Sequence, residues 1–309
     1  MVQTILGSGG GIGVPLAREL KKYTDQIRLV SRNPKSVNES DELYRADIKD
    51  PGQIDGAIAG SDVVYVTIGF EYNLRVWQET WPSFLRQVIS SCIKHNSKLV
   101  FFDNIYMYSG ESLPFMTENA AIKPPSKKGE VRKVLREMIL EETASNRLTG
   151  LIVRAADFYG PENKNSALSI MVADNLMKGK KAQVFGDPGK IHTYTYTPDA
   201  AKATAILGNT PDAYQQEWHA PTTKEKLTNI QWIEMIASEL GTEPKYQKVP
   251  SFMLNIIGLF VPMMKEFPEM LYQYEQDYIF DSSKFENRFG LFATAPQEGI
   301  KNLIKSLKS

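Results

Sequence analysis

The chain has 309 residues, of which 42% are hydrophobic and 23% charged, a balance typical of one large globular domain or slightly more. Its 36 basic and 36 acidic residues give a formal net charge of zero, which argues against nucleic-acid or membrane-surface partners. The single cysteine, Cys92, excludes an intramolecular disulfide and fits a reducing cytoplasm, and the first residues lack a secretory-signal pattern.

Strand and helix patterns alternate over the first half of the chain. We expect strands at 3–6, 27–31, 43–47, 62–69, 98–104 and 150–156, and helices at 11–22, 52–60, 77–95 and 129–144. Several of these strands are apolar throughout. The pattern therefore predicts an α/β fold, a doubly wound parallel sheet with helices on both faces.

The regular alternation of strand and helix patterns ends after residue 160. The alternating segment 193–197 is typical of an edge or antiparallel strand, and helices are expected at 198–207 and 230–240. The apolar stretch 252–264 is too short to span a bilayer and predicts a buried helix, the alternative being a surface helix that touches lipid or a partner. We expect a nucleotide-binding domain over 1–160. A small, mostly helical substrate lobe over 161–309 would pack on it and carry the last strands of the sheet.

The segment "GSGGGIG" over 7–13 lies between the first strand and the first helix. Glycine lets the backbone approach a phosphate closely, and a helix N-terminus offers free N–H groups and a partial positive charge. We therefore expect a dinucleotide diphosphate at Gly7, Gly10, Gly11, Ile12 and Gly13. The alternative is a purely structural turn.

The end of the second strand, "LVSRNP", bears on the choice of dinucleotide. No acid stands there to hold a ribose 2′-hydroxyl, whereas Ser31 and Arg32 are suited to a 2′-phosphate. This favours NADP over NAD, unless Arg32 is only a solvated loop residue. Asp47 is expected either near the adenine or as a capping carboxylate for the next helix.

Several segments in chain order resemble the extended or atypical short-chain dehydrogenase/reductases, the group of NAD-dependent epimerases and dehydratases. They are "GSGGGIG", "ADIKD", "VTIG", "FFDNIYMYSG", "VRAADFYGPEN" and "FDSSKFENRFG". The resemblance implies a Rossmann fold that binds NAD(P). It also implies cofactor contacts at Ile48, Ile68, Gly69 and Ala156.

The catalytic motif of that family, Tyr-x-x-x-Lys beside a Ser or Thr, is replaced, because none of the fourteen tyrosines has a lysine four places on. Comparison with the family places Lys128 at the tyrosine position, Arg132 at the lysine position and Asn104 at the serine position. Arg132 can still bind a ribose or phosphate but cannot deliver a proton. Tyr106 or Tyr108 could supply the acid instead, although tyrosines here are more often packing residues.

Three functions follow as hypotheses. The favoured one is an NAD(P)-dependent oxidoreductase or epimerase/dehydratase-like enzyme acting on a small carbonyl or sugar-type substrate. The others are a non-catalytic NADP(H) sensor and a structural subunit.

His95, His192 and His219 lack metal-ligand spacing, and no nucleophile elbow occurs. His192 is expected on the surface, in packing or toward the substrate lobe. The helices over 77–95 and 129–144 resemble subunit-pairing helices of the family, which leaves a homodimer open.

Overall fold

The computed structural model describes residues 1–250 and 265–309, so the predicted helix over 252–264 lies outside the described residues. The centre of the fold is a seven-stranded sheet of order β10-β6-β5-β4-β1-β2-β3, in which all neighbouring strands are parallel. This confirms the predicted α/β doubly wound fold. The strands are β1 Gln3–Leu6, β2 Ile27–Ser31, β3 Glu42–Arg45, β4 Val63–Val66, β5 Lys98–Asp103, β6 Gly150–Arg154 and β10 Glu217–His219.

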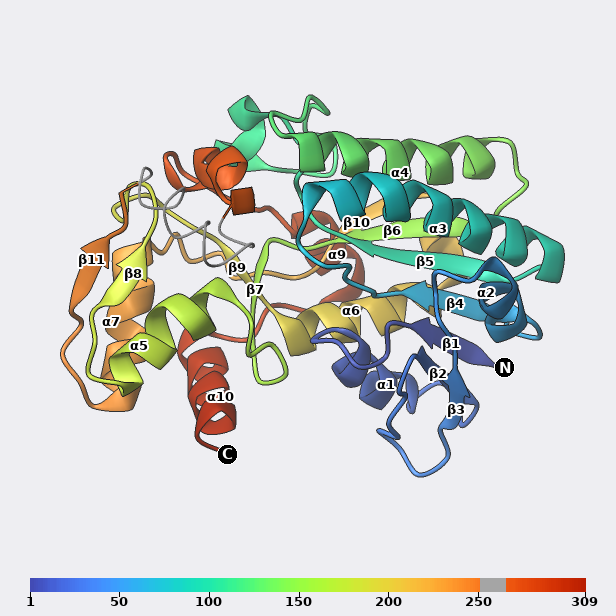
Figure 1. The fold of residues 1–309 in the computed structure, drawn as a ribbon, viewed down its shortest axis with the longest axis horizontal. Helices are drawn as coiled ribbons and strands as arrows, with labels where there is room; N and C mark the ends of the chain where they lie inside the picture. Colours follow the sequence, from blue (N-terminus) through green and yellow to red (C-terminus); the bar gives the residue numbers. More distant parts are fainter. Residues whose placement is uncertain (251–264) are drawn as a thin grey trace.

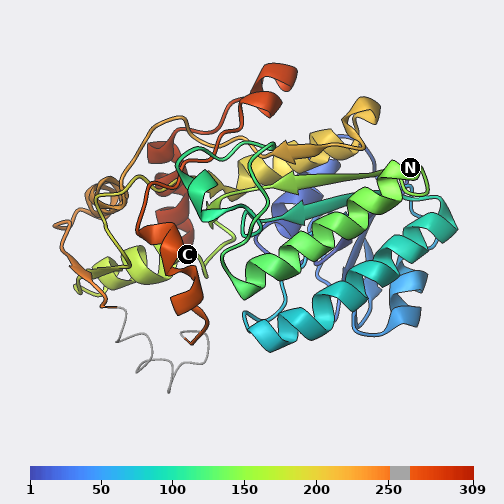
Figure 2. The same cartoon turned by 90° about the horizontal axis from the view of Figure 1, so that it is seen from above.

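Helices cover both faces of this sheet (Figure 1). On one face lie α2 Pro51–Ile58, α3 Leu74–His95 and α4 Lys127–Ala144, and on the other α1 Gly13–Leu20 and α6 Thr197–Gly208. Each of the two helical layers packs on the sheet around its own apolar cluster. The strands carry apolar side chains on both faces, so both faces must be covered. The view of Figure 2 shows α3 and α4 lying side by side across one face.

The rest of the chain after β6 forms most of a smaller lobe beside the sheet (Figure 1). Trp232 is fully buried in the apolar cluster at its centre. The elements of the lobe are strands β7 Asp157–Tyr159, β8 Ala182–Val184, β9 Tyr194–Tyr196 and β11 Tyr246–Lys248, helices α5 Asp174–Met177, α7 Asn229–Leu240 and α10 Pro296–Lys308, the π-helical turn Leu168–Ala173 and the 3-10 turn Pro268–Tyr274. Helix α9 Ser283–Phe289 instead contacts β10, and the 3-10 turns Gly110–Phe115 and Pro211–Ala213 follow β5 and α6 along the chain.

Two details differ from the simple sequence pattern. Strand β9 pairs with β7 in parallel, so the antiparallel alternative for 193–197 is wrong, although both strands of this pair are edges. Strand β10 and helix α6 both follow residue 160. Strand β10 is nevertheless an edge strand of the central sheet, and α6 packs with α1 on one of its faces. The division at residue 160 stays a prediction. No described helix is both long and apolar enough to cross a membrane.

A buried charge network ties the sheet to α4. Arg154 on β6 is fully buried, with its guanidinium 2.5 Å from Glu217 on β10 and 3.7 Å from Asp103 on β5. Arg136 on α4 contacts the same Glu217 at 2.5 Å. Burial raises the pKa of Asp103, and the charges of Arg132 and Arg154 oppose that shift. The network joins three strands and a helix at the sheet end nearest the site.

Replacing Arg154 with methionine is expected to lower the free energy of unfolding by about 3–5 kcal/mol, because the buried Asp103 and the half-buried Glu217 lose a partner. The matched control is Arg288→Met, which removes an exposed pair with Asp212 and is expected to cost less than about 1 kcal/mol. Urea unfolding of both variants measures the difference. Equal losses of unfolding free energy in the two variants would show that the buried network stabilises the fold no more than an exposed ion pair does.

Candidate cofactor and substrate site

The glycine-rich turn between β1 and α1 packs against itself and against the end of β4. Gly7 has φ of +99°, and a Cβ there would lie 2.7 Å from the backbone of Ile68. A Cβ on Gly13 would lie 2.4 Å from the carbonyl oxygen of Gly7. Real Cβ atoms do not come so close, so these two glycines are required by the turn itself.

Gly9 and Gly10 face open space instead. A Cβ on Gly9 would meet no atom within 4 Å, and one on Gly10 would lie 3.6 Å from the nearest atom. The N-cap of α1, Ile12, offers no side-chain hydrogen bond, and the first turn of the helix carries no acid. An uncapped helix end above an open glycine turn fits a diphosphate.

These two glycines line a cavity of about 490 Å³ that crosses the carboxyl ends of four adjacent strands, β4, β1, β2 and β3. Such a crevice is where open α/β sheets bind their ligands. Eight of the residues predicted for the cofactor line it: Gly7, Gly10, Ser31, Arg32, Asp47, Ile48, Ile68 and Gly69. The other five, Gly11, Ile12, Gly13, Arg132 and Ala156, are not among its lining residues.

Charged side chains of both signs line this cavity where it passes the ends of β2 and β3. Arg32 and Lys49 are exposed and line it, as does Asp47. The Asp47 carboxylate accepts the N–H of Lys49 at 3.0 Å, whereas the cap of α2 is Asp50. The capping alternative for Asp47 is therefore wrong, and its exposed carboxylate lines the cavity instead.

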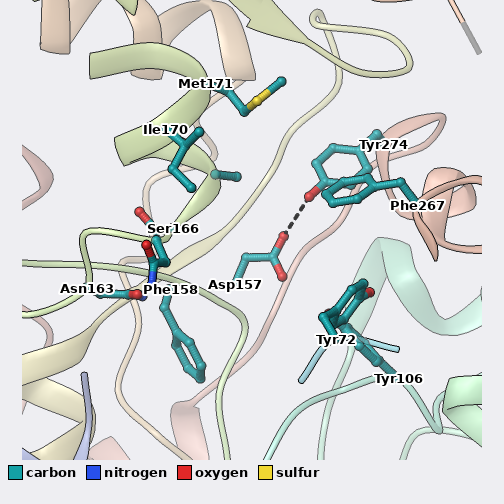
Figure 3. A pocket seen from close by; sticks show the side chains of 12 residues that line it. Tyr72, Tyr106, Asp157, Phe158, Asn163, Ser166, Ile170, Met171, Phe267 and Tyr274 are labelled. Atoms are coloured by element: carbon teal, nitrogen blue, oxygen red, sulfur yellow. Dashed lines mark hydrogen bonds between the residues drawn. The ribbon is translucent and has the colours of Figure 1, made fainter. Parts of the chain in front are cut away.

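A second cavity, of about 340 Å³, lies between the sheet and the lobe. Figure 3 shows its aromatic walls, which come from Tyr72 after β4, Tyr106 after β5, and Phe158, Phe267 and Tyr274 of the lobe. The chain from Thr67 to Tyr72 joins the two cavities, since its first residues line one and its last residue lines the other.

Tyr106 is the predicted catalytic residue that lines this second cavity. Its ring stacks on Trp77 at a centroid distance of 6.2 Å. Burial, Tyr72 and the charge of Asp157, in that order, raise the pKa of Tyr106 well above its ordinary value. The phenol is therefore a hydrogen-bond donor at neutral pH.

Lys128 and Arg132 are engaged in contacts within the protein. The fully buried Lys128 ammonium pairs with Glu266 and with Glu269 and lies 4.8 Å from the ring centre of Tyr72. Arg132 lies over Trp77 and Trp81 at 4.5 and 4.2 Å and contacts Asp103 at 3.3 Å. In this arrangement both cations stabilise the walls of the site.

Tyr108 and Asn104 line neither cavity. The Nδ1 of His219 donates to the carbonyl of Asp281 at 2.6 Å, so its Nε2 accepts from the Tyr108 hydroxyl at 2.7 Å. Burial raises the pKa of Tyr108 to about 12 and lowers that of His219 to about 3. Asn104 accepts the N–H of Tyr106 at 3.1 Å and thus shapes the loop that presents that tyrosine.

Sequence reasoning missed Asp157. Its carboxylate lines the aromatic cavity and accepts hydrogen bonds from His192 at 2.9 Å and from Tyr274 at 3.2 Å. His192 is buried and stacked between Tyr274 and Tyr278, so it is a packing residue with a polar contact to the site. A signal was available, because an aspartate directly after a strand of a parallel sheet stands at the binding edge.

No group of three His, Cys, Asp or Glu side chains suited to a metal ion occurs in the described ranges 1–250 and 265–309.

Comparison with known proteins identifies the class. The model of the NAD dependent epimerase/dehydratase family matches residues 4–219, and the chain belongs to this family. The short-chain dehydrogenase/reductase family 42E member 1 of Danio rerio is 19% identical over 88% of this chain and 76% of its own length. The UDP-N-acetyl-alpha-D-glucosaminuronate decarboxylase of Bacillus cytotoxicus is 23% identical over 65% of this chain and 68% of its own length.

Solved structures of such enzymes share the fold. The dTDP-glucose 4,6-dehydratase DesIV of Streptomyces venezuelae, with NAD bound, superposes with a TM-score of 0.82 at 15% identity, over 100% of this chain and 97% of that one. The UDP-glucuronic acid 4-epimerase of Bacillus cereus, also with NAD, gives 0.81 at 16% identity, over 100% and 99%. Membership of this family confirms the predicted oxidoreductase/epimerase-like class of enzyme, and the solved structures confirm the fold.

Valine at Gly9 is expected to weaken NAD(H) binding at least about tenfold while leaving the free energy of unfolding within about 0.5 kcal/mol, because the side chain enters open space in the cavity. Valine at Gly13 is the contrasting variant, since its Cβ would overlap the backbone of Gly7 and lower stability. Dinucleotide fluorescence titration and thermal unfolding separate the two. Unchanged binding in the Gly9 variant would place the diphosphate elsewhere.

Proposed function

We propose that the chain binds a nicotinamide adenine dinucleotide in the glycine-lined cavity and oxidises or reduces a small sugar-type or carbonyl substrate in the aromatic cavity. When bound, the dinucleotide supplies the hydride donor or acceptor. The observation that carries the proposal is the placement of two cavities on neighbouring strand ends, linked by the segment Thr67 to Tyr72. The relatives named for UDP- and dTDP-sugars support the sugar-type substrate.

Within this proposal Tyr106 replaces the missing family tyrosine. Its hydroxyl binds the carbonyl oxygen of the substrate, donates a proton to the alkoxide as a carbonyl is reduced, and accepts it back in the reverse reaction. Tyr72 lies beside Tyr106 on the same wall of the cavity (Figure 3). Lys128 and Arg132 take no part in proton transfer, because carboxylates and aromatic rings surround their charged groups.

The dinucleotide is proposed to be NADP(H). Arg32 and Lys49 line the cavity beside the ends of β2 and β3, where an adenosine ribose would lie, and β2 ends in Ser31 rather than an acid. A 2′-phosphate would make charge-assisted hydrogen bonds with these cations. NAD, which the cited solved structures contain, is the alternative.

The Arg32→Ala variant is expected to bind NADPH about tenfold or more weakly and NADH nearly as tightly as the unmodified chain. Arg45→Ala is the matched control, because Arg45 is exposed at the end of β3 and does not line the cavity. Fluorescence titration with NADPH and NADH gives six affinities, two each for the unmodified chain and the two variants. Equal losses for NADPH and NADH would refute the preference for NADP.

The Tyr106→Phe variant is expected to lose about 10²–10⁴-fold in kcat with unchanged dinucleotide affinity, since only the proton-transferring hydroxyl is removed. Tyr108→Phe removes a hydroxyl that faces His219 and is expected to lower stability by about 1 kcal/mol while keeping turnover. The assay follows nicotinamide absorbance over a panel of carbonyl compounds, alcohols and sugars. Tight NADPH binding with no turnover over that panel would favour a redox sensor.

A further inference from the structure

The order of the strands gives the glycine-lined cavity a direction across the sheet. Its lining residues follow β3, β2, β1 and β4, and these four strands are neighbours in that order. With the adenosine beside Arg32 and Lys49 and the diphosphate on the glycine-rich turn after β1, the second ribose of a dinucleotide would lie over the end of β4. The next strand of the sheet is β5, which leads to Tyr106 and the aromatic cavity.

Arg132, the residue expected from the sequence to bind a ribose or phosphate, is held away from this position. Its guanidinium lies over the rings of Trp77 and Trp81 and contacts Asp103 at 3.3 Å. It lines neither the glycine-lined cavity nor the aromatic one. The hydroxyls of a ribose at the end of β4 therefore need a different partner.

Glu71 is the charged residue that lines the cavity on the β4 side, and its side chain is exposed. Thr67 uses its hydroxyl within the protein, because it donates to the carbonyl oxygens of Leu6 and Gly7 at 3.3 Å. The other lining residues on this side are Ile68, Gly69, Phe70 and Val76, which have no polar side-chain group. The two oxygens of a carboxylate can each accept a hydroxyl of a ribose diol, the contact by which Rossmann folds commonly hold the ribose of the adenosine.

The backbone on both sides of Glu71 is held in place. The ring of Phe70 packs edge-on against Trp81 at a centroid distance of 4.6 Å. The N–H of Asn73, the residue that caps α3, donates to the carbonyl oxygen of Glu71 at 2.8 Å. Tyr72 already lines the aromatic cavity, so Glu71 stands where one cavity leads to the other. A contact made from a fixed segment loses little affinity to ordering of the chain.

We propose that Glu71 binds the second ribose of the dinucleotide, with its carboxylate accepting hydrogen bonds from the 2′- and 3′-hydroxyls. This contact replaces the ribose contact expected of Arg132 and positions the nicotinamide beside the aromatic cavity. The inference rests on the proposed function for the location of the dinucleotide, and it concerns binding alone.

ADP-ribose and ADP isolate this contact, because the two probes differ by the second ribose. Each is titrated into the full chain loaded with NADPH, and the loss of bound-nicotinamide fluorescence gives its affinity. We expect Glu71→Ala to weaken ADP-ribose binding about tenfold, since two charge-assisted hydrogen bonds are lost. ADP should bind no more weakly than to the unmodified chain. Glu71→Gln, which keeps one accepting oxygen, is expected to show an intermediate loss for ADP-ribose.

Glu79→Ala is the matched control, because it removes the same charge from an exposed pair with Arg75 on α3 and lines neither cavity. It should leave the affinities for ADP-ribose and ADP unchanged, and melting temperatures should be equal for all variants because both glutamates are exposed. Unweakened ADP-ribose binding in Glu71→Ala, or an equal loss for ADP, would overturn the role of Glu71. Failure of the unmodified chain to bind NADPH would instead refute the proposed cofactor site, and this inference with it.

Discussion

The close contact of the first glycine turn with the end of β4 is the constraint on which the site depends. Gly7, with φ of +99° and its backbone against Ile68, brings the turn and the strand end together, and Gly13 lets α1 begin directly over Gly7. A side chain at either position would separate the elements that enclose the cavity. Gly9 and Gly10 can then present bare backbone to a ligand because the turn is already held by its neighbours.

Two cations that the sequence analysis expected at catalytic positions are held by contacts within the protein. Both Lys128 and Arg132 lie on α4. Two carboxylates of the lobe pair with Lys128, whereas two tryptophans and Asp103 contact Arg132. Paired and stacked cations stabilise a wall better than they transfer protons. Tyr106, by contrast, lines the aromatic cavity, and this is why we propose it as the acid.

The sequence by itself predicted six of the seven strands of the sheet, the helices that cover it and eight residues that line the glycine cavity, but not the edge strand β10. This worked because apolar strands, amphipathic helices and a glycine turn are local patterns whose periodicity the chain carries directly. It predicted less well which of the candidate catalytic residues line a cavity, since it placed residues by their position along a strand or helix. Tyr106 and Tyr108 are two residues apart, yet one faces a cavity and the other His219.

Tertiary structure alone decided the second cavity and its charge. The partners of Lys128 come from more than 130 residues further along the chain, and Asp157 meets His192 and Tyr274 only because β7 pairs with β9 and the lobe folds back over the sheet. Electrostatic character depends on which distant groups end up within a few ångströms of each other, and no local pattern encodes that distance. The sequence determined where a dinucleotide can bind, and the packing of the lobe determined what kind of molecule can lie beside it.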